Sequence, residues 1–244
     1  MREHVPRGRP ELPPAASAEP AQWIPARTHG FARSVLSLVP DGFPCYVRLF
    51  HPCLIAGPAG PRPVRWREVA EANRKTVHAG MQFTTVVRDA TAGRRPDHLP
   101  GLYDVPPVTG TLPESTTATL AATLAAHTTT TDECWFGRWE GYGPMFAADE
   151  VAPTLSLPYR RYHLFTASLA ALTADNAPGI WQSPNLWWPR DRSWFVATEV
   201  DLDSTYLAVS GECAADLLTS DELEILAIDP SAGVDINSDT TGRP

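Results

Sequence analysis

Proline occurs along most of this chain and limits the length of every helix and strand that can form. The 244-residue sequence contains 25 prolines. Proline lacks a backbone N–H and has a fixed φ, so it interrupts helices and inner strands and is favoured in turns. Hydrophobic residues make up 43% of the chain, as expected of a protein with a buried core. The sequence therefore predicts a folded chain with short elements and many connections.

The two ends of the chain differ in composition from its middle. Residues 1–28 are rich in Pro, Ala, Glu and Arg, and residues 231–244 are mostly small and polar. Such segments bury little apolar surface to offset the entropy of ordering them, so we expect two mobile tails. Residues 29–230 are predicted to form a single globular domain, because their length suits one sizeable core.

Four segments have the pattern of short helices. The clearest begins with Thr111, Pro113 and Glu114, which match a capping box with proline in the first turn. Apolar residues recur behind it at helical spacing, and the threonines at 128–131 end it. The other predicted helices are Phe31–Val39, Trp66–Lys75 and Cys213–Leu218.

Strands are predicted where apolar and polar residues alternate. Tyr206–Val209 is expected to pair with the strand Trp194–Asp201 through a turn at Asp203-Ser204. A loop or single helical turn is expected at Pro184–Pro189, and a long loop at 89–110. Because helices and strands interleave without a regular βαβ repeat, we predict an α+β fold with a mostly antiparallel sheet and several short helices. Further strands are predicted at Cys45–Phe50, Cys134–Glu140, Thr154–Leu157, Tyr162–Ser168 and Leu223–Ile228.

Acidic residues are concentrated towards the C-terminal end. Residues 191–244 carry 12 acidic and 2 basic side chains, a net charge of −10, whereas residues 1–190 carry a net charge of +2. The acidic part repels nucleic-acid phosphates, so no nucleic acid is expected as a partner, and a basic protein or a cation suits it better. An acidic surface that keeps the protein in solution explains the same charge.

The sequence contains none of the common motifs for cofactors, membrane spans or export. It has no GxxxxGK[ST], no GxGxxG after a strand, no HExxH and no GxSxG, so we predict no cofactor. No apolar run of about 18 residues is present to span a membrane. The N-terminus lacks the apolar stretch of a secretory signal, so the expected location is the cytoplasm.

Three carboxylates recur at every second position near the end of a predicted strand. If the strand continues through Asp203, then Glu199, Asp201 and Asp203 lie on one face. Clustered carboxylates bind a hard cation or raise one another's pKa for acid–base chemistry. Alternatively, Asp203 belongs to an ordinary turn, and Glu199 pairs with Arg190 or Arg192.

Four of the eight tryptophans lie between positions 181 and 194. Their flat faces can stack on sugars, bases or the side chains of a partner. Trp187 and Trp188 are adjacent, so in an extended chain they cannot point the same way, and at least one is expected to pack in the core. We favour a tryptophan-rich core and keep Trp187, Trp188 and Arg192 as candidate partner-binding residues.

The cysteines and histidines provide weaker candidates. Three possible zinc ligands are Cys45, His51 and Cys53. A zinc site needs a fourth ligand, and the spacing of the two cysteines is unusual for zinc. A nucleophilic pair of His127 and Cys134 has no specific geometry behind its spacing. We expect these side chains to be structural.

The block from Pro184 to Tyr206, PNLWWPRDRSWFVATEVDLDSTY, resembles a group of uncharacterised actinobacterial proteins. The segments Arg48–Pro52 and Trp135–Gly143 share this resemblance, which covers most of residues 31–230. No activity is assigned to the group, so the resemblance implies no functional residue. The alternation of short elements with Trp- and Gly-marked turns also resembles immunity or adaptor proteins of bacterial toxin systems.

Two functions are consistent with these patterns. The first is a non-enzymatic binding or adaptor protein with an acidic binding surface. The alternative is a metal-assisted hydrolase or transferase that uses Glu199, Asp201 and Asp203. We favour the binding protein, because the catalytic motifs are absent.

Overall fold

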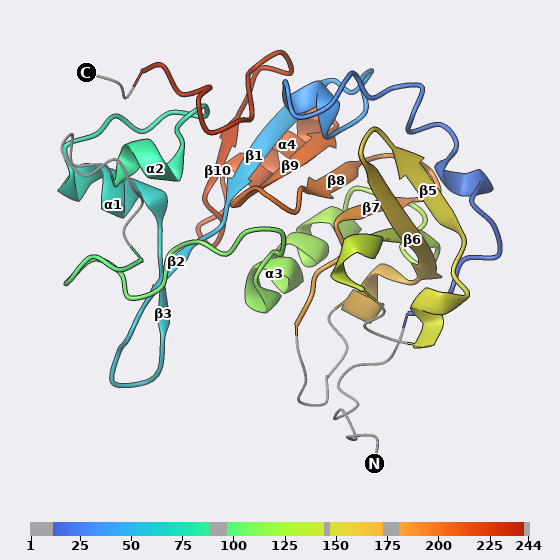
Figure 1. The fold of residues 1–244 in the computed structure, drawn as a ribbon, viewed down its shortest axis with the longest axis horizontal. Helices are drawn as coiled ribbons and strands as arrows, with labels where there is room; N and C mark the ends of the chain where they lie inside the picture. The colour runs from blue at the N-terminus through green and yellow to red at the C-terminus, as the bar shows by residue number, and fades with distance from the viewer. Residues whose placement is uncertain (1–11, 88–96, 144–146, 173–180, 242–244) are drawn as a thin grey trace.

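A computed structural model describes residues 12–87, 97–143, 147–172 and 181–241 of the chain (Figure 1). Within these ranges the fold is α+β, with four α-helices, an eight-stranded antiparallel sheet and a two-stranded sheet. This confirms the fold class predicted from the sequence. The described part contains no helix that is long and apolar enough to cross a membrane. The helices are α1 Trp66–Ala72, α2 Phe83–Val86, α3 Glu114–Ala125 and α4 Gly211–Leu218.

The large sheet has the strand order β10-β1-β9-β8-β7-β4-β6-β5, and neighbouring strands are antiparallel throughout. The hairpin of β2 and β3 forms the small sheet and projects from the main body (Figure 1). The strands are β1 Cys45–Phe50, β2 Cys53–Ile55, β3 Arg62–Val64, β4 Cys134–Trp139, β5 Thr154–Leu157, β6 Arg160–Ala167, β7 Leu186–Pro189, β8 Phe195–Thr198, β9 Ser204–Val209 and β10 Ile225–Ala227.

Both faces of the large sheet are covered, so most of its strands are buried on both sides. Helices α3 and α4 pack on one face, where Leu120 and Leu217 meet Trp187 and Val196. The segment 12–43 covers the opposite face. In Figure 1 this blue segment can be followed from beside β5 to the start of β1. Burial on two sides explains why β7, β8 and β9 contain apolar residues at consecutive positions.

The described parts of both predicted tails pack against the domain. In the first tail Ala21 and Ile24 are fully buried on the sheet. Ala15 N also donates to Leu164 O at 2.9 Å, so the chain near Pro14 extends the sheet beside β6. The prediction of a mobile tail at 1–28 is therefore wrong for residues 12–28. A few apolar residues are enough to order this segment, because they pack on an open face of the sheet. Residues 1–11 lie outside the described ranges.

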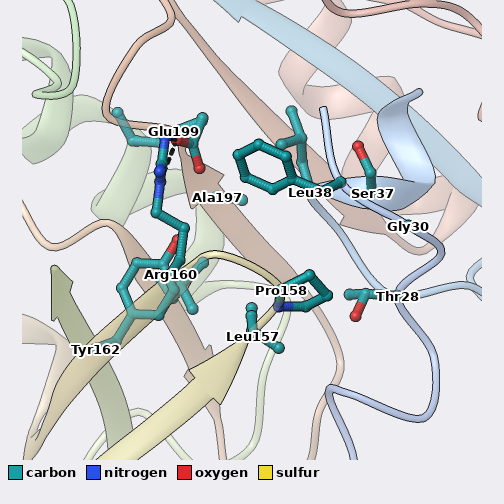
Figure 2. A pocket seen from close by; sticks show the side chains of 13 residues that line it. Thr28, Gly30, Ser37, Leu38, Leu157, Pro158, Arg160, Tyr162, Ala197 and Glu199 are labelled. Carbon is teal, nitrogen blue, oxygen red and sulfur yellow. Dashed lines mark hydrogen bonds and ion pairs between the residues drawn. The ribbon is translucent and has the colours of Figure 1, made fainter. Parts of the chain in front are cut away.

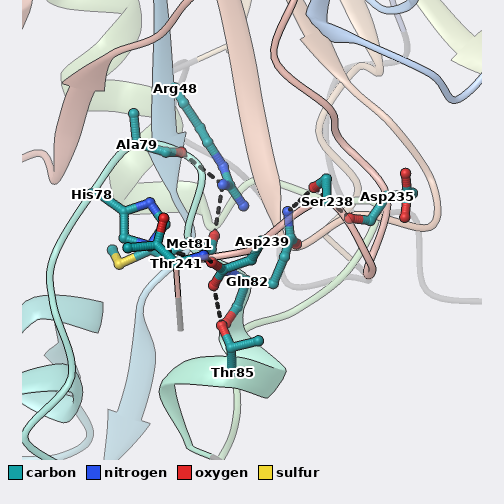
Figure 3. Close-up of polar contacts among 10 residues, drawn as sticks. All are labelled: Arg48, His78, Ala79, Met81, Gln82, Thr85, Asp235, Ser238, Asp239 and Thr241. Atoms are coloured by element: carbon teal, nitrogen blue, oxygen red, sulfur yellow. Dashed lines mark hydrogen bonds and ion pairs between the residues drawn. The ribbon is translucent and has the colours of Figure 1, made fainter. Parts of the chain in front are cut away.

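The C-terminal segment is held by a buried carboxylate (Figure 3). Asp239 accepts hydrogen bonds from Gln82 N, at 3.1 Å, and from the Thr85 hydroxyl, and it lies 3.4 Å from His78 Nε2. Val234 is buried against the sheet. The predicted C-terminal tail is thus corrected for residues 231–241, whereas residues 242–244 lie outside the described ranges.

Three local predictions also change. Pro184–Pro189 contains strand β7, which pairs with β4 and β8, instead of a loop or helical turn. The predicted helix Phe31–Val39 is reduced to a short 3₁₀ turn at Val35–Ser37. Helix α3 begins after Pro113 without a side-chain cap, because the Thr111 hydroxyl interacts with Ser183 instead. Of the predicted loop 89–110, residues 89–96 lie outside the described ranges.

Candidate functional site

The predicted row of carboxylates does not form on a strand face. Strand β8 ends at Thr198, and Leu202 N donates to Glu199 O at 3.1 Å, which begins a turn. The main-chain oxygen of Asp203 accepts a hydrogen bond from His51 N at 3.1 Å. The period of two that aligns side chains on a strand is therefore lost between Glu199 and Asp203.

Arg160 brings Glu199 and Asp201 together. Its Nη2 lies 2.6 Å from Glu199 Oε1 and 2.6 Å from Asp201 Oδ2, and its Nε donates to the same Glu199 oxygen at 2.8 Å. Figure 2 shows the Arg160 guanidinium directed at Glu199. The guanidinium carbon lies 5.1 Å from the Phe31 ring centre and 5.4 Å from that of Trp139, within range of cation–π attraction. We refer to Arg160, Glu199 and Asp201 as the arginine clamp.

The sequence predicted different partners for these charges. Arg190 pairs with Glu133, with 2.8 Å between Nη1 and Oε2. Arg192 lies over the Trp23 ring, with its guanidinium carbon 5.0 Å from the ring centre. The predicted pairing of Glu199 with either arginine is therefore wrong. It failed because the true partner, Arg160, lies 39 positions earlier in the chain.

The electrostatics of the arginine clamp indicate a structural ion pair. Burial raises the pKa of Glu199, while the hydrogen bond and charge of Arg160 oppose that rise. Burial also raises the pKa of Tyr162 beside it. The cavity at this position measures about 20 Å³, which holds no more than a water molecule. The clamp therefore leaves no room for a substrate.

The two adjacent tryptophans are core residues. Trp187 packs against α3 and α4, and Trp188 packs on the opposite face of the sheet, stacked on Phe195 and Trp135. Their opposite directions confirm the expectation from extended backbone. Both are fully buried, so neither presents a surface to a partner. This corrects their assignment as candidate partner-binding residues.

The histidine and cysteine candidates are engaged or buried. His51 lies with Nδ1 2.7 Å from Val108 O and Nε2 2.9 Å from the Thr205 hydroxyl, so neither nitrogen is available to a metal. Burial raises the pKa of the Cys134 thiol to about 12, which disfavours the nucleophilic thiolate. His127 is 2.9 Å from Asp216 instead. Among the described residues, no group of three or more His, Cys, Asp and Glu side chains is arranged to hold a metal ion.

A groove of about 460 Å³ lies between the start of α3, the end of β3 and the loop before β10. We call it the α3 groove. It was not predicted from the sequence, because its walls come from three separate parts of the chain, at 49–65, 113–119 and 221–224. The acidic run from Asp221 to Glu224 was the only local signal for it. Its lining residues are Leu49, Phe50, Pro52, Leu54, Pro61, Pro63, Arg65, Pro113, Ser115, Thr116, Thr119, Asp221, Glu222, Leu223 and Glu224.

Glu224 fixes one wall of the α3 groove. Its carboxylate accepts hydrogen bonds from Trp66 N at 2.6 Å and Arg67 N at 2.8 Å, the first backbone N–H groups of α1. Burial raises the pKa of Glu224, and these two hydrogen bonds oppose the rise. The side chain thereby joins α1 to the strand β10, which gives the groove a rigid wall.

The rim of the α3 groove is acidic. Asp221 and Glu222 are exposed, and the Thr119 hydroxyl donates to Glu222 Oε2 at 2.8 Å. Arg65 is the only basic residue of the lining, and its Nη2 donates to the main-chain oxygen of Asp221. Asp221 and Glu222 therefore place two exposed carboxylates in the described lining of the α3 groove, which contains a single cation.

A second hollow, of about 390 Å³, lies between α3 and residues 169–170. Its wall on α3 consists of alanines, and Asp132 is its only charged residue. It has few polar groups to orient a ligand, whereas binding sites combine apolar walls with several placed polar groups. The α3 groove meets that description better.

Comparison with protein-family models, curated protein sequences and solved structures found no match for this chain. Function is therefore inferred from the geometry and charge of the described residues.

Proposed function

We propose that this protein is a non-enzymatic binding or adaptor protein, and that the α3 groove holds a basic segment of a partner protein. The observation that carries the proposal is the composition of the groove rim. Asp221 and Glu222 supply two exposed negative charges, and the single lining cation, Arg65, is held by a main-chain oxygen. Opposite charges across an interface favour association and select the partner.

The walls of the α3 groove suit an extended peptide. Four prolines line it, at positions 52, 61, 63 and 113, together with Leu49 and Leu54. Prolines have restricted backbones, so the walls lose little entropy on binding. The volume of about 460 Å³ lies within the usual range for binding pockets. A basic side chain with apolar neighbours would place its charge at the rim and its neighbours against the prolines.

The arginine clamp does not support the alternative of a metal-assisted enzyme. Glu199 and Asp201 are both used by Arg160, and the cavity beside them holds no more than a water molecule. The groove, by contrast, lies open and carries charge. We therefore locate the acidic binding surface at Asp221 and Glu222.

The test is a selection of random peptides displayed on phage against the immobilised protein, repeated with the double variant Asp221→Asn, Glu222→Gln. We expect the selected peptides to contain Lys or Arg flanked by apolar residues. Their affinity for the double variant should fall about tenfold, equivalent to about 1.4 kcal/mol. Added salt should weaken binding to the unaltered protein, because rim charges are screened.

The matched control removes two exposed carboxylates that lie outside the groove lining, in the double variant Glu19→Gln, Glu212→Gln. It has the same net charge as the test variant and should bind the peptides with unchanged affinity. Selected peptides without basic residues, or equal losses in both variants, would contradict the proposal.

A further inference from the structure

Strand β5 forms one edge of the large sheet, and its outer backbone groups are unpaired among the described residues. Leu164 N donates to Pro153 O at 2.8 Å, so the backbone of Pro153 is directed towards β6. Leu155 and Leu157 lie two and four positions further along, so in the register with β6 their backbone groups point the same way. In an antiparallel pair, alternate residues direct both N–H and C=O towards the partner strand. The N–H and C=O groups of Thr154 and Ser156 therefore point outwards, and both residues are exposed.

The chain itself limits the length of this free edge. Beyond Pro153, the same side of β6 is occupied by the N-terminal segment, because Ala15 N donates to Leu164 O and Thr166 N donates to Pro13 O. The free part is thus β5 alone. At the other edge of the sheet, β10 has only three residues, and its Ile225 is 5% exposed.

Two exposed hydrophobic residues flank β5. Tyr159 is 83% exposed and Val151 is 73% exposed, the largest values among the large hydrophobic side chains of the described residues. Val151 lies four positions before Leu155, and Tyr159 lies four positions after it. A free strand edge is a template for pairing with another strand, and these two side chains provide apolar contact area at either end of it.

We propose that a second copy of this chain pairs with β5, antiparallel, across a two-fold axis at Leu155. In this register Thr154 exchanges two backbone hydrogen bonds with Ser156 of the second copy, and the symmetric pair exchanges two more. Val151 is brought towards Tyr159 of the second copy at each end. The result is one continuous sheet through two protomers.

A second copy fits this edge better than an unrelated strand because the edge is self-complementary. A two-fold interface requires each residue to meet a suitable residue of the same surface. Here Thr154 lies opposite Ser156 of the second copy, so two hydroxyl side chains meet and no like charges oppose each other. At each end, Val151 and Tyr159 bring two apolar side chains together. The α3 groove is lined from β1 and the residues before β10, at the opposite edge, so pairing through β5 leaves it open.

Sedimentation velocity over a range from about 1 µM to about 1 mM tests the proposal, because a short interface of this kind gives a weak dimer. We expect the mass to double with rising concentration. Ser156→Pro removes an outward N–H without affecting a bond to β6, so its dissociation constant should rise at least about tenfold. Circular dichroism establishes whether this variant is folded.

Tyr159→Asn provides a second variant, since asparagine tolerates the φ of +59° at this position. It should also weaken the dimer. Ile236→Ser is the control, because Ile236 is 58% exposed but lies in the C-terminal segment, and its dimer should be unchanged. A protein that remains monomeric throughout, or a dimer that Ser156→Pro leaves intact, overturns the proposal.

Cysteine cross-linking tests the register. In a Cys45→Ser background, we expect Thr154→Cys mixed with Ser156→Cys to form a disulfide-linked dimer faster than either variant alone. Directly opposed strand residues have the Cα separation that a disulfide requires. The remaining cysteines are buried. Equal rates in the mixture and in the separate variants would contradict the two-fold axis at Leu155.

Discussion

His51 lies fully buried at the end of β1, and its two ring nitrogens have different partners. Val108 O can only accept, so Nδ1–H donates to it, and Nε2 of the neutral ring accepts from the Thr205 hydroxyl. Burial lowers the pKa of His51 to about 4, and the nearby charge of Arg48 adds to this effect, while the bond to Val108 opposes it. His51 is therefore neutral in the folded protein at pH values where an unfolded chain binds a proton.

This shift predicts a loss of stability in mild acid. Below the ordinary pKa of 6.5 the unfolded state binds a proton at His51 and the folded state does not, so the free energy of unfolding falls as the pH falls towards about 4. Over that interval this one group should remove about 3 kcal/mol. Urea denaturation of the unaltered protein and of His51→Gln, between these pH values, measures the difference.

The exposed residue His98 provides the control for that measurement. We expect His98→Gln to retain the pH dependence of the unaltered protein, whereas His51→Gln should have a flatter curve. Parallel curves for His51→Gln and the unaltered protein would show that His51 is not the group responsible.

At the scale of elements, the arginine clamp joins parts of the chain that are distant in sequence. Arg160 begins β6, Glu199 follows β8, and the stacked ring of Phe31 belongs to the segment that covers the sheet. The side chain of Glu199 is 12% exposed and that of Asp201 is 77% exposed. Arg160 should therefore stabilise the fold mainly through Glu199, because an ion pair with an exposed carboxylate such as Asp201 contributes little to the free energy of unfolding.

A double-mutant cycle tests this difference. Arg160→Met should lower the free energy of unfolding by about 3 kcal/mol, because it leaves a buried carboxylate without a partner. Adding Glu199→Gln should recover much of that loss, whereas Asp201→Asn alone should cost less than about 1 kcal/mol. Urea denaturation of the four proteins of the cycle, and of Asp201→Asn, provides the measurement. Additive effects of Arg160→Met and Glu199→Gln would exclude the coupling.

At the scale of the whole molecule, the sheet has two covers of different kinds. Helices α3 and α4 cover one face, and the largely irregular segment 12–43 covers the other. Within that segment, Trp23 meets Phe195 edge-on with ring centres 5.8 Å apart, and Ile24 is fully buried. The segment therefore completes the core instead of extending from it.

Ile24→Ala tests this role of the N-terminal segment. Removal of a fully buried isoleucine side chain should lower the free energy of unfolding by about 2–5 kcal/mol. A residue in a mobile tail would show no such loss. Ile236→Ala, at a position 58% exposed, should change stability by less than about 0.5 kcal/mol. Equal effects of the two substitutions in urea denaturation would contradict the packing of the segment.

Much of the secondary structure was predictable, and the exceptions have physical causes. The strands Cys45–Phe50 and Thr154–Leu157 were predicted with their observed limits, because each is bounded by turn residues or proline. Strand β7 was missed, because prolines at both ends of a short run also suit a loop. The run forms a strand because it pairs with β4 on one side and with β8 on the other.

The candidate site was much less predictable. The carboxylates Glu199 and Asp201 were identified, but a turn removes them from a common strand face, and Arg160 holds them. The α3 groove was not identified at all. Its acidic rim and its proline walls come from segments that only the folded chain brings together.

The sequence by itself determined the α+β class, the short elements and the opposite directions of Trp187 and Trp188. These properties depend on local backbone geometry and on the alternation of side chains along a strand. Only the tertiary structure decided that residues 12–43 cover a sheet face, that Arg160 pairs with Glu199, and that Asp221 and Glu222 border a groove. Each of these depends on contacts between distant segments, whose free energy comes from the whole packed core and not from any local pattern.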